Sequence, residues 1–533
     1  MYISCMNNKF TLSSGSDNAV VCLQAPLYRE AEGELIAEYE LRETCGQGST
    51  AVYEDAANRV TITVEQKNDT LFYIRRRWEN LSDRARKLQT VLRVSPCFDV
   101  AKYLIPCVSV NGNVFGAGLE PKGLERDGEK WIFGYDREAI PACTLTENAD
   151  FACALFASAE DAASLVSSCS VSRDHESGAW YQELFHPVIE KPVTYSTRDG
   201  YAEGYDSFIE LGAGEVFETG MYLCVNRPRW ENFGIAEVLV QALSLYGDNS
   251  DMFVPEKKAL WDRSIAFARS LMTHYKDKKG FIIGFHRNQD DEFVYREDEC
   301  FELAWCGQNI LFSRMFIEDW ARFGHQESLD DALEILDTRA SFCTAKSGLL
   351  AAQLKDYEDL DNAEADTCNM GYGAYEYLRC WERLRELGID KPAYLEAARG
   401  LCDFFCAHFS PEYGFGKAWR LDGVCTSEGG SIGAFVICPL VKIYALTKEE
   451  KYLAMAEKAL KYYVERDLDK FCCTAGALDT SCVDKETSAP FIMSAVMLYE
   501  LTGKQVYLEY AEKAAYYFTS WMFHYQPDRK SVV

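Results

Sequence analysis

The chain has 533 residues, and its 83 acidic against 55 basic side chains give a formal net charge of −28. A field of that sign repels phosphate backbones and anionic bilayers, which argues against nucleic-acid binding and against a role at a membrane surface. The hydrophobic share of 48% with 26% charged residues is typical of a packed globular protein, and no apolar run approaches the ~20 residues of a spanning helix.

The N-terminal residues lack the basic stretch, apolar core and small-residue cleavage site of a signal peptide, so we expect a cytoplasmic protein. The 21 cysteines form no Cys-x-x-Cys pair, and the seven histidines include no pair at i, i+4 spacing. We therefore expect no disulfide framework, no metal centre and no cofactor.

The first part of the chain, to about residue 225, has the pattern of a β domain. Short β-prone runs alternate with turns, and residues 60–64 show a period of two, which is typical of a strand with one buried face. Other such runs are 34–41, 71–75, 90–94 and 216–225. The pattern predicts a β-sandwich domain over residues 1–226.

From residue 227 the pattern becomes helical, and it repeats. Residues 443–463 match residues 498–518 at ten of 21 positions, and a third copy lies at 394–405. Each unit pairs an inner helix that is apolar nearly all round with an amphipathic outer helix. The expected pairs are 233–246 with 256–275, 300–321 with 328–345, 367–387 with 391–409, 430–446 with 449–466, and 487–502 with 505–522.

A β-sandwich followed by helical hairpins resembles the six-hairpin glycosidases, whose catalytic domain is an (α/α)6 toroid. The resemblance covers nearly the whole chain and implies a two-domain α+β protein with a toroid catalytic domain over residues 227–527. Only five hairpins are counted, so we expect the last one to be missing and residues 528–533 to be a non-native tail. The resemblance further implies a carbohydrate-active enzyme, an oligosaccharide or polysaccharide substrate, and a pocket where loops leading into inner helices meet loops of the sandwich.

Acidic loops precede four of the inner helices and supply the catalytic candidates. Glycoside cleavage needs one protonated carboxyl and one ionised carboxylate, and loops at one rim of a toroid would bring such groups together. Acidic residues at these positions also cap helices, which is the simpler structural explanation for each one. The candidates, in order, are Asp366, Glu428, Glu302, Asp484 and Glu486.

Aromatic and polar residues near these acids are the substrate-binding candidates, because sugar rings pack on aromatic faces and their hydroxyls bind amides and charges. Lys417 and Arg420 favour an anionic sugar such as a uronic acid. A glycine-rich loop of the β domain contributes two asparagines that could reach the pocket. The full set is Trp305, Gln308, Tyr372, Lys417, Trp419, Arg420, Asn111, Asn113, His286 and Arg287.

These observations favour a glycoside hydrolase that uses carboxylate acid and base groups. A polysaccharide lyase stays open, because similar toroids catalyse β-elimination from uronates with a tyrosine or histidine base. A non-catalytic glycan-binding protein also stays open, whereas a sugar epimerase is disfavoured by the large β domain. The sugar, the linkage, the stereochemical outcome and the oligomeric state are not predicted.

Overall fold

The computed structural model describes the greater part of the chain, and the structural statements below concern that part. The described residues are 2–6, 9–13, 19–32, 35–114, 120–158, 162–192, 194–197, 200–246, 256–282, 285–287, 292–295, 302–304, 309–473 and 483–525.

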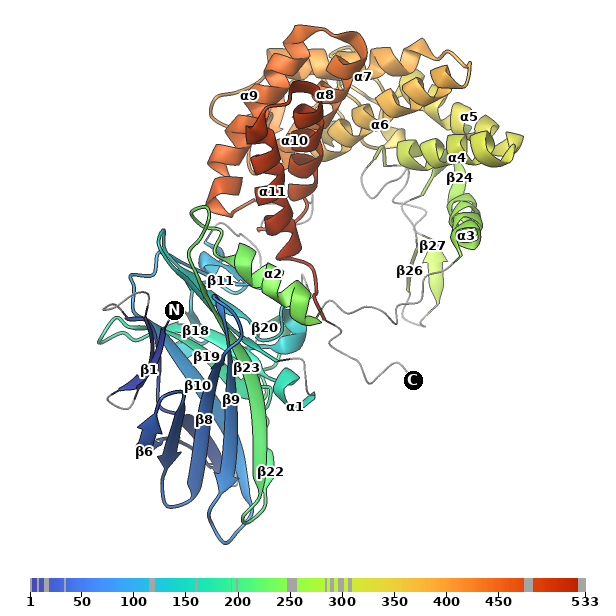
Figure 1. The fold of residues 1–533 in the computed structure, drawn as a ribbon. Coiled ribbons are helices and arrows are strands. Elements are labelled where there is room, and N and C mark those ends of the chain that lie inside the picture. The colour runs from blue at the N-terminus through green and yellow to red at the C-terminus, as the bar shows by residue number, and fades with distance from the viewer. Residues whose placement is uncertain are drawn as a thin grey trace.

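The N-terminal part consists of two large antiparallel sheets (Figure 1). The first has the order β1-β2-β3-β10-β19-β18-β15, with β4 and β22 paired to β10 and β5 paired to β4. Its strands are β1 (Tyr2–Met6), β2 (Lys9–Ser13), β3 (Ala19–Leu23), β4 (Leu27–Glu32), β5 (Leu35–Glu40), β10 (Arg86–Pro96), β15 (Phe133–Gly134), β18 (Ser168–Arg173), β19 (Trp180–His186) and β22 (Ile209–Leu211).

The second sheet has the order β12-β11-β16-β17-β23-β9-β8-β7-β6. Its strands are β6 (Arg42–Gln47), β7 (Thr50–Glu54), β8 (Asn58–Gln66), β9 (Leu71–Asn80), β11 (Lys102–Ile105), β12 (Ser109–Val110), β16 (Thr144–Glu147), β17 (Ala152–Ala157) and β23 (Val216–Asn226). Smaller elements are β13 (Glu125–Arg126), β14 (Glu129–Lys130), β20 (Thr194–Thr197), β21 (Gly200–Ala202) and the short helix α1 (Ala162–Leu165).

The core of the sandwich follows from the period-two pattern. In β8 the side chains of Val60, Ile62 and Val64 are buried, and the residues between them are half-buried. One apolar cluster joins both sheets and includes Phe10, Leu92 and the three β8 residues. Strands lie at every run for which the sequence predicted one, so the expectation of a large β region is confirmed.

The C-terminal part is helical, and the whole is a mixed α+β protein (Figure 1). The helices are α2 (Ile235–Tyr246), α3 (Lys257–Ser270), α4 (Asn309–Phe323), α5 (Gln326–Phe342), α6 (Thr367–Glu386), α7 (Pro392–Ala407), α8 (Ile437–Thr447), α9 (Glu450–Arg466), α10 (Ser488–Thr502) and α11 (Gln505–Thr519). The 3-10 helices are η1 (Asn111–Asn113), η2 (Tyr135–Arg137), η4 (Leu354–Glu358), η5 (Ile432–Val436) and η6 (Leu468–Lys470).

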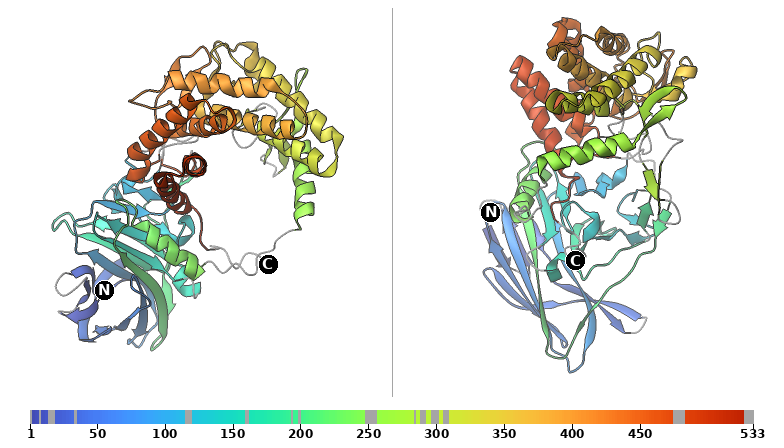
Figure 2. Two further views of the ribbon diagram at one scale, coloured as in Figure 1. Left: turned by 45° about the horizontal axis from the view of Figure 1, so that its top comes forward. Right: turned by 90° about the vertical axis from the view of Figure 1, so that its right-hand side faces the viewer.

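Four helical hairpins, from α4/α5 to α10/α11, follow one another in an arc (Figure 2). The inner helices α4, α6, α8 and α10 contact one another in sequence, and the outer helices α5, α7 and α9 do the same. An outer-helix tyrosine lies beside an acidic residue of the preceding outer helix at each step, which explains why the sequence repeats there. The pairs are Tyr394 with Asp337, Tyr452 with Asp403 (both 2.8 Å) and Tyr507 with Glu457.

The first expected helix pair differs from the prediction, because α2 and α3 have separate partners. Helix α2 packs on the second sheet and on α11, and its Val238 and Leu239 belong to the same cluster as Phe156 and Tyr222 of the sheet. Helix α3 packs on α4, where Trp261 donates to Asp319 at 2.9 Å. The described helices therefore form an open arc that rests on the sandwich.

Short strands also interrupt the helical part, which the sequence did not predict. A hairpin of β24 (Met272–Tyr275) and β25 (Lys278–Phe281) follows α3, and a second hairpin pairs β26 (Phe285–Arg287) with β27 (Phe293–Tyr295). A three-stranded sheet is formed by β28 (Glu364–Asp366), β29 (Ala418–Arg420) and β30 (Cys425–Ser427). The expected domain boundaries, 1–226, 227–527 and 528–533, stay predictions.

Candidate active site

Glu302 is held in the segment that precedes the inner helix α4. Its carbonyl oxygen accepts a hydrogen bond from the Asn309 side chain at 2.6 Å, and the next residue, Leu303, donates its amide to Ala352. Glu302 also forms a β-bridge with Gln353, whose side-chain amide donates to Oε1 of the carboxyl group. These contacts bury Glu302 to 7% exposure and fix where its carboxyl group lies.

Asp366 ends β28 and is the N-cap of the next inner helix, α6. Oδ1 accepts from the backbone amide of Asn369 at 2.8 Å, and Oδ2 accepts from the side-chain amide of the same residue at 2.9 Å. This is the side-chain cap that an aspartate provides at a helix start, and here it is only 3% exposed.

The two carboxyl groups meet at Asn369. Its Oδ1 accepts from the amide of Ala304 at 3.1 Å, which ties the Glu302 segment to the start of α6. Burial, with the negative charge of Asp366 next in weight, raises the pKa of Glu302 to about 7. Burial also raises the pKa of Asp366, against the hydrogen bonds from Asn369. Oε2 of Glu302 accepts no hydrogen bond from the described residues. Burial therefore disfavours the ionised form of both carboxyl groups of the pair.

A cavity of about 410 Å³ lies beside this pair, inside the arc of helices. Ala304, two residues after Glu302, and Cys368, two residues after Asp366, both line it. The remaining lining residues come from α4, α6, η5, α10, α11 and the segment before α10, and they are Leu311, Tyr372, Glu376, Phe435, Lys485, Glu486, Ala489 and Phe518.

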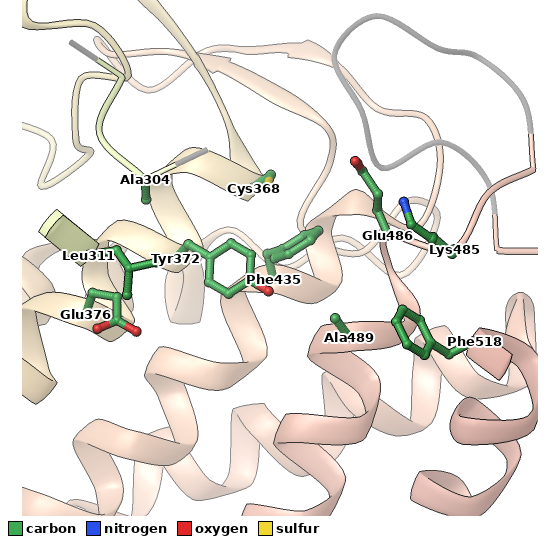
Figure 3. Close-up of a pocket in the computed structure, with 10 residues that line it drawn as sticks. All are labelled: Ala304, Leu311, Cys368, Tyr372, Glu376, Phe435, Lys485, Glu486, Ala489 and Phe518. Carbon is green, nitrogen blue, oxygen red and sulfur yellow. The ribbon is translucent and has the colours of Figure 1, made fainter. Parts of the chain in front are cut away.

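The cavity has two facing walls (Figure 3). Ala304 and Leu311 lie on one side, and Lys485 and Glu486 lie on the other. Tyr372 and Phe435 lie between the walls, with ring centroids 4.7 Å apart and planes tilted by 57°. The cavity therefore offers an aromatic surface between the wall formed by Ala304 and Leu311 and the carboxylate of Glu486, an arrangement suited to a sugar ring.

The two other predicted acids have different surroundings. Glu428 follows β30, only two strands from Asp366 in the three-stranded sheet, but its side chain is exposed and it does not line the cavity. Asp484 is half-buried, and its Oδ1 accepts from the amide of Glu486 at 2.9 Å, so it shapes the turn before α10. Of the predicted acids, Glu486 lines the cavity, Glu302 and Asp366 are buried two residues before the lining residues Ala304 and Cys368, and Glu428 lies at the surface.

The predicted binding loop around β29 is corrected by the structure. Trp419 is 3% exposed, donates its indole N–H to the carbonyl of Phe415 at 2.7 Å, and packs in the core, so it is no platform for a sugar. Arg420 pairs with the neighbouring Asp422 at 2.5 Å. Lys417 is half-buried, and its backbone carbonyl accepts from the amide of Thr367 at 2.9 Å, which holds β29 against the start of α6.

The remaining candidates are two asparagines of the β domain and four residues with side chains outside the described part of the chain. Asn113 is buried, and its side chain bonds the backbone of its own loop at Val110 and Pro121, so it stabilises that loop and does not reach the cavity. Asn111 is exposed at a φ of 47°. Trp305 and Gln308 lie outside the described residues, as do the side chains of His286 and Arg287 on β26.

Sequence reasoning missed Asn369, Gln353 and Phe435. The position of Asn369, three residues after an acidic residue at a helix start, was a usable signal for a cap contact. Gln353 and Phe435 carry no local signal, because long-range packing brings them to the site. Within the described part of the chain, no group of three or more His, Cys, Asp and Glu side chains is arranged to hold a metal ion.

Comparison with known proteins gives distant structural likenesses. A polysaccharide lyase matches with a TM-score of 0.42 and 10% identity, over 96% of this chain and 80% of the other. A GH76 α-mannanase of Bacteroides thetaiotaomicron matches at 0.36 and 15%, over 53% and 72%. The unsaturated glucuronyl hydrolase of Bacillus sp. GL1 matches at 0.32 and 12%, over 39% and 60%.

These identities and scores are low, and they assign neither a family nor an activity to this chain. No family model matches the sequence, and no curated protein matches it. Each helix in the described ranges is too short or too polar to cross a membrane.

Proposed function

We propose that this protein is a carbohydrate-active enzyme that hydrolyses glycosidic bonds. The observation that carries the proposal is the buried Glu302, two residues from the aromatic-lined cavity, in a setting where burial raises its pKa to about 7. Cleavage of a glycosidic bond requires such an acid, because the departing sugar oxygen must receive a proton. An exposed glutamate would be ionised at the same pH and could not supply it.

In the proposed mechanism, Glu302 is the general acid and Glu486 is the ionised carboxylate on the opposite wall. Two carboxyl groups must flank the scissile bond. Glu302 and Asp366 are held together through Asn369, and Ala304, two residues after Glu302, lies on the wall of the cavity opposite Glu486. Glu486 lies on the other side, where it can activate a water molecule or attack the sugar carbon. Burial raises the pKa of Glu302 to about 7, and the negative charge of Asp366 adds to the rise.

Tyr372 and Phe435 supply the surface against which a sugar ring packs. Their rings stand between the walls, so a ring seated on them has one wall on each side. Contacts of this kind bury the C–H face of a sugar while leaving its hydroxyl groups to polar partners such as Lys485 and Glu376.

A lyase is the second candidate, since Tyr372 could serve as the base and Lys485 could neutralise a uronate carboxylate. Burial raises the pKa of Tyr372, with neighbouring thiols and carboxylates adding to the rise. A phenol that holds its proton more tightly than usual is a poor base at neutral pH, and for this reason hydrolysis is the first proposal.

The test is product analysis on a panel of neutral and uronate-containing oligosaccharides in water enriched in ¹⁸O. Hydrolysis places one labelled oxygen in each new reducing end and produces no ultraviolet absorbance. Elimination produces an absorbing unsaturated sugar without the label. Glu302→Gln and Glu486→Gln should each abolish the labelled product, whereas Glu428→Gln should leave it unchanged. Labelled product at wild-type rates from both cavity variants would refute the assignment.

A further inference from the structure

An arginine occupies a core position on the outer helix α5. The buried stripe of this helix includes Leu329, Ala332 and Leu336, and Arg339 continues it one turn later at 2% exposure. A charge is rarely buried so completely unless it has a partner, because its desolvation is costly. This position therefore needs an explanation from its surroundings.

Arg339 forms no ion pair with an acidic side chain among the described residues. Its three guanidinium nitrogens make no hydrogen bond to an oxygen or nitrogen atom there, and the side chain interacts with the thiol of Cys343. An arginine remains protonated in proteins, so its charge must be balanced through space. The titratable groups that its charge affects are Glu302, Asp356, Cys343 and Tyr377.

Residues 351–354 connect the end of α5 to the acid pair. On one side the amide of Ala351 donates to the carbonyl of Cys343 at 2.8 Å, and the amide of Cys343 donates to the carbonyl of Arg339 at 2.9 Å. On the other side the same segment carries Gln353, which bridges to Glu302 and donates to its Oε1. The backbone N–H of Gln353 donates to Oδ2 of Asp356 at 2.9 Å, which fixes this residue in the segment.

Glu302 thus has two different sides. Towards α6 it faces Asp366 and Asn369, and the charge of Asp366 favours the protonated carboxyl. On its other side Glu302 accepts a hydrogen bond from Gln353, and the buried Arg339 cation acts on it through space, with the charge of Asp356 adding a weaker opposing effect. The hydrogen bond from Gln353 and the charge of Arg339 both favour the ionised carboxylate.

We infer that Arg339 is a positioning residue for Glu302, and that its buried guanidinium and the Gln353 amide together support the carboxylate that Glu302 becomes after it releases its proton. The inference rests on the proposed function. During glycoside cleavage the proton moves from Oε2 of Glu302 to the departing sugar oxygen, and the electron pair of the broken O–H bond stays on the carboxylate. A buried carboxylate without a compensating cation would resist this step.

The test compares Arg339→Met, which removes the cation, with Arg339→Lys, which keeps one, and with Gln353→Met, which removes the amide donor. The readout is the infrared carbonyl band of the protonated Glu302 carboxyl as a function of pH, assigned by subtracting the same spectrum of each variant with Glu302→Gln added. The alkaline limb of the pH profile of kcat/KM for glycan cleavage is measured in parallel.

Arg339→Met should raise the titration midpoint of Glu302 by about one pH unit and move the alkaline limb upward by the same amount. In Arg339→Lys the titration midpoint and the alkaline limb should lie closer to their wild-type values. In Gln353→Met the midpoint and the limb should rise by less than in Arg339→Met. If Arg339→Met does not fold, the other two variants still decide. Unchanged midpoints in Arg339→Met and Gln353→Met would overturn the inference.

The two proposals fail in different ways. An active glycan-cleaving enzyme with unshifted midpoints would remove the role of Arg339 and keep the proposed function. If the variants shift the titration midpoint of Glu302 but the wild-type protein cleaves no glycan of the panel, the proposed function is removed and the electrostatic support of Glu302 is kept.

Discussion

Two acidic segments of this protein precede inner helices, yet they differ in what surrounds them. Glu302, before α4, is enclosed by Gln353 and Asn309 and carries a raised pKa. Glu428, before η5 and α8, follows a surface hairpin and is exposed. A position before an inner helix is therefore not enough to raise the pKa of an acidic residue. Glu302 differs from Glu428 because segments distant in the sequence bury it.

The largest expected effect is on catalysis. Glu302→Gln removes the transferable proton while keeping the size of the side chain, so kcat/KM for glycan cleavage should fall by roughly 10² to 10⁴. The matched control, Glu428→Gln, should stay within about twofold of wild type. Equal losses of kcat/KM in the two variants would mean that the buried and the exposed glutamate contribute alike to catalysis, and would contradict the contrast drawn between them.

The next effect is on stability as a function of pH. The folded protein holds the Glu302 proton with a pKa of about 7 against an ordinary value of 4.5. This contribution is complete below about pH 4.5, falls as the pH rises, and is lost above about pH 7. The free energy of unfolding of the wild type, measured in urea relative to that of Glu302→Gln, should therefore fall by roughly 3 kcal/mol between these two pH values. A constant difference across that range would contradict the raised pKa.

Packing offers a third contrast between the two regions. A Cβ at Gly371, in α6, would lie 2.5 Å from the carbonyl oxygen of Phe435, whereas a Cβ at Gly429 would meet nothing within 4 Å. We expect Gly371→Ala to lower the free energy of unfolding by about 1–3 kcal/mol, because backbone must move. Gly429→Ala should change it by less than about 0.5 kcal/mol. Thermal or urea unfolding measures both, and equal effects would show that η5 does not pack closely on α6.

The smallest effect belongs to the surface hairpin. Arg420 pairs with Asp422 at the surface, where its side chain is 40% exposed. Such pairs contribute little, so Arg420→Ala should change the free energy of unfolding by at most about 0.5 kcal/mol and leave glycan cleavage unaltered. A marked loss of affinity for uronate-containing substrates in this variant would restore the role that the sequence suggested for Arg420.

Periodicity predicted the helices well because each one buries a continuous face. Predicted and observed bounds of the last three hairpins agree within a few residues, as for α11 at Gln505–Thr519 against the expected 505–522. The predicted start of α4 at residue 300 was wrong by nine residues, since the helix begins at Asn309. Residues 302–303 instead bond to the segment at 352–353. That pairing joins positions about fifty apart and leaves no local pattern.

The site was predicted less completely, for physical reasons that individual residues show. The positions of Asp366 and Tyr372 at the start of α6 could be predicted because a helix start has a local sequence pattern, whereas their roles in the site stay predictions. The strands β28, β29 and β30 have three residues each, too few for a period of two to be visible. Arg339 was overlooked, because a charged residue in a helical pattern is normally assigned to the wet face. Trp419 showed the reverse error, since an aromatic on a loop was taken for a platform.

The account depends most on one property, the protonation of Glu302 at neutral pH. Infrared titration of the wild-type protein, with Glu302→Gln as the reference, measures it without any assumption about substrate. We predict a protonated carboxyl band that is absent from the variant and disappears with a midpoint near pH 7. A midpoint near the ordinary value of 4.5 would contradict the proposal that this buried side chain is the acid of the site.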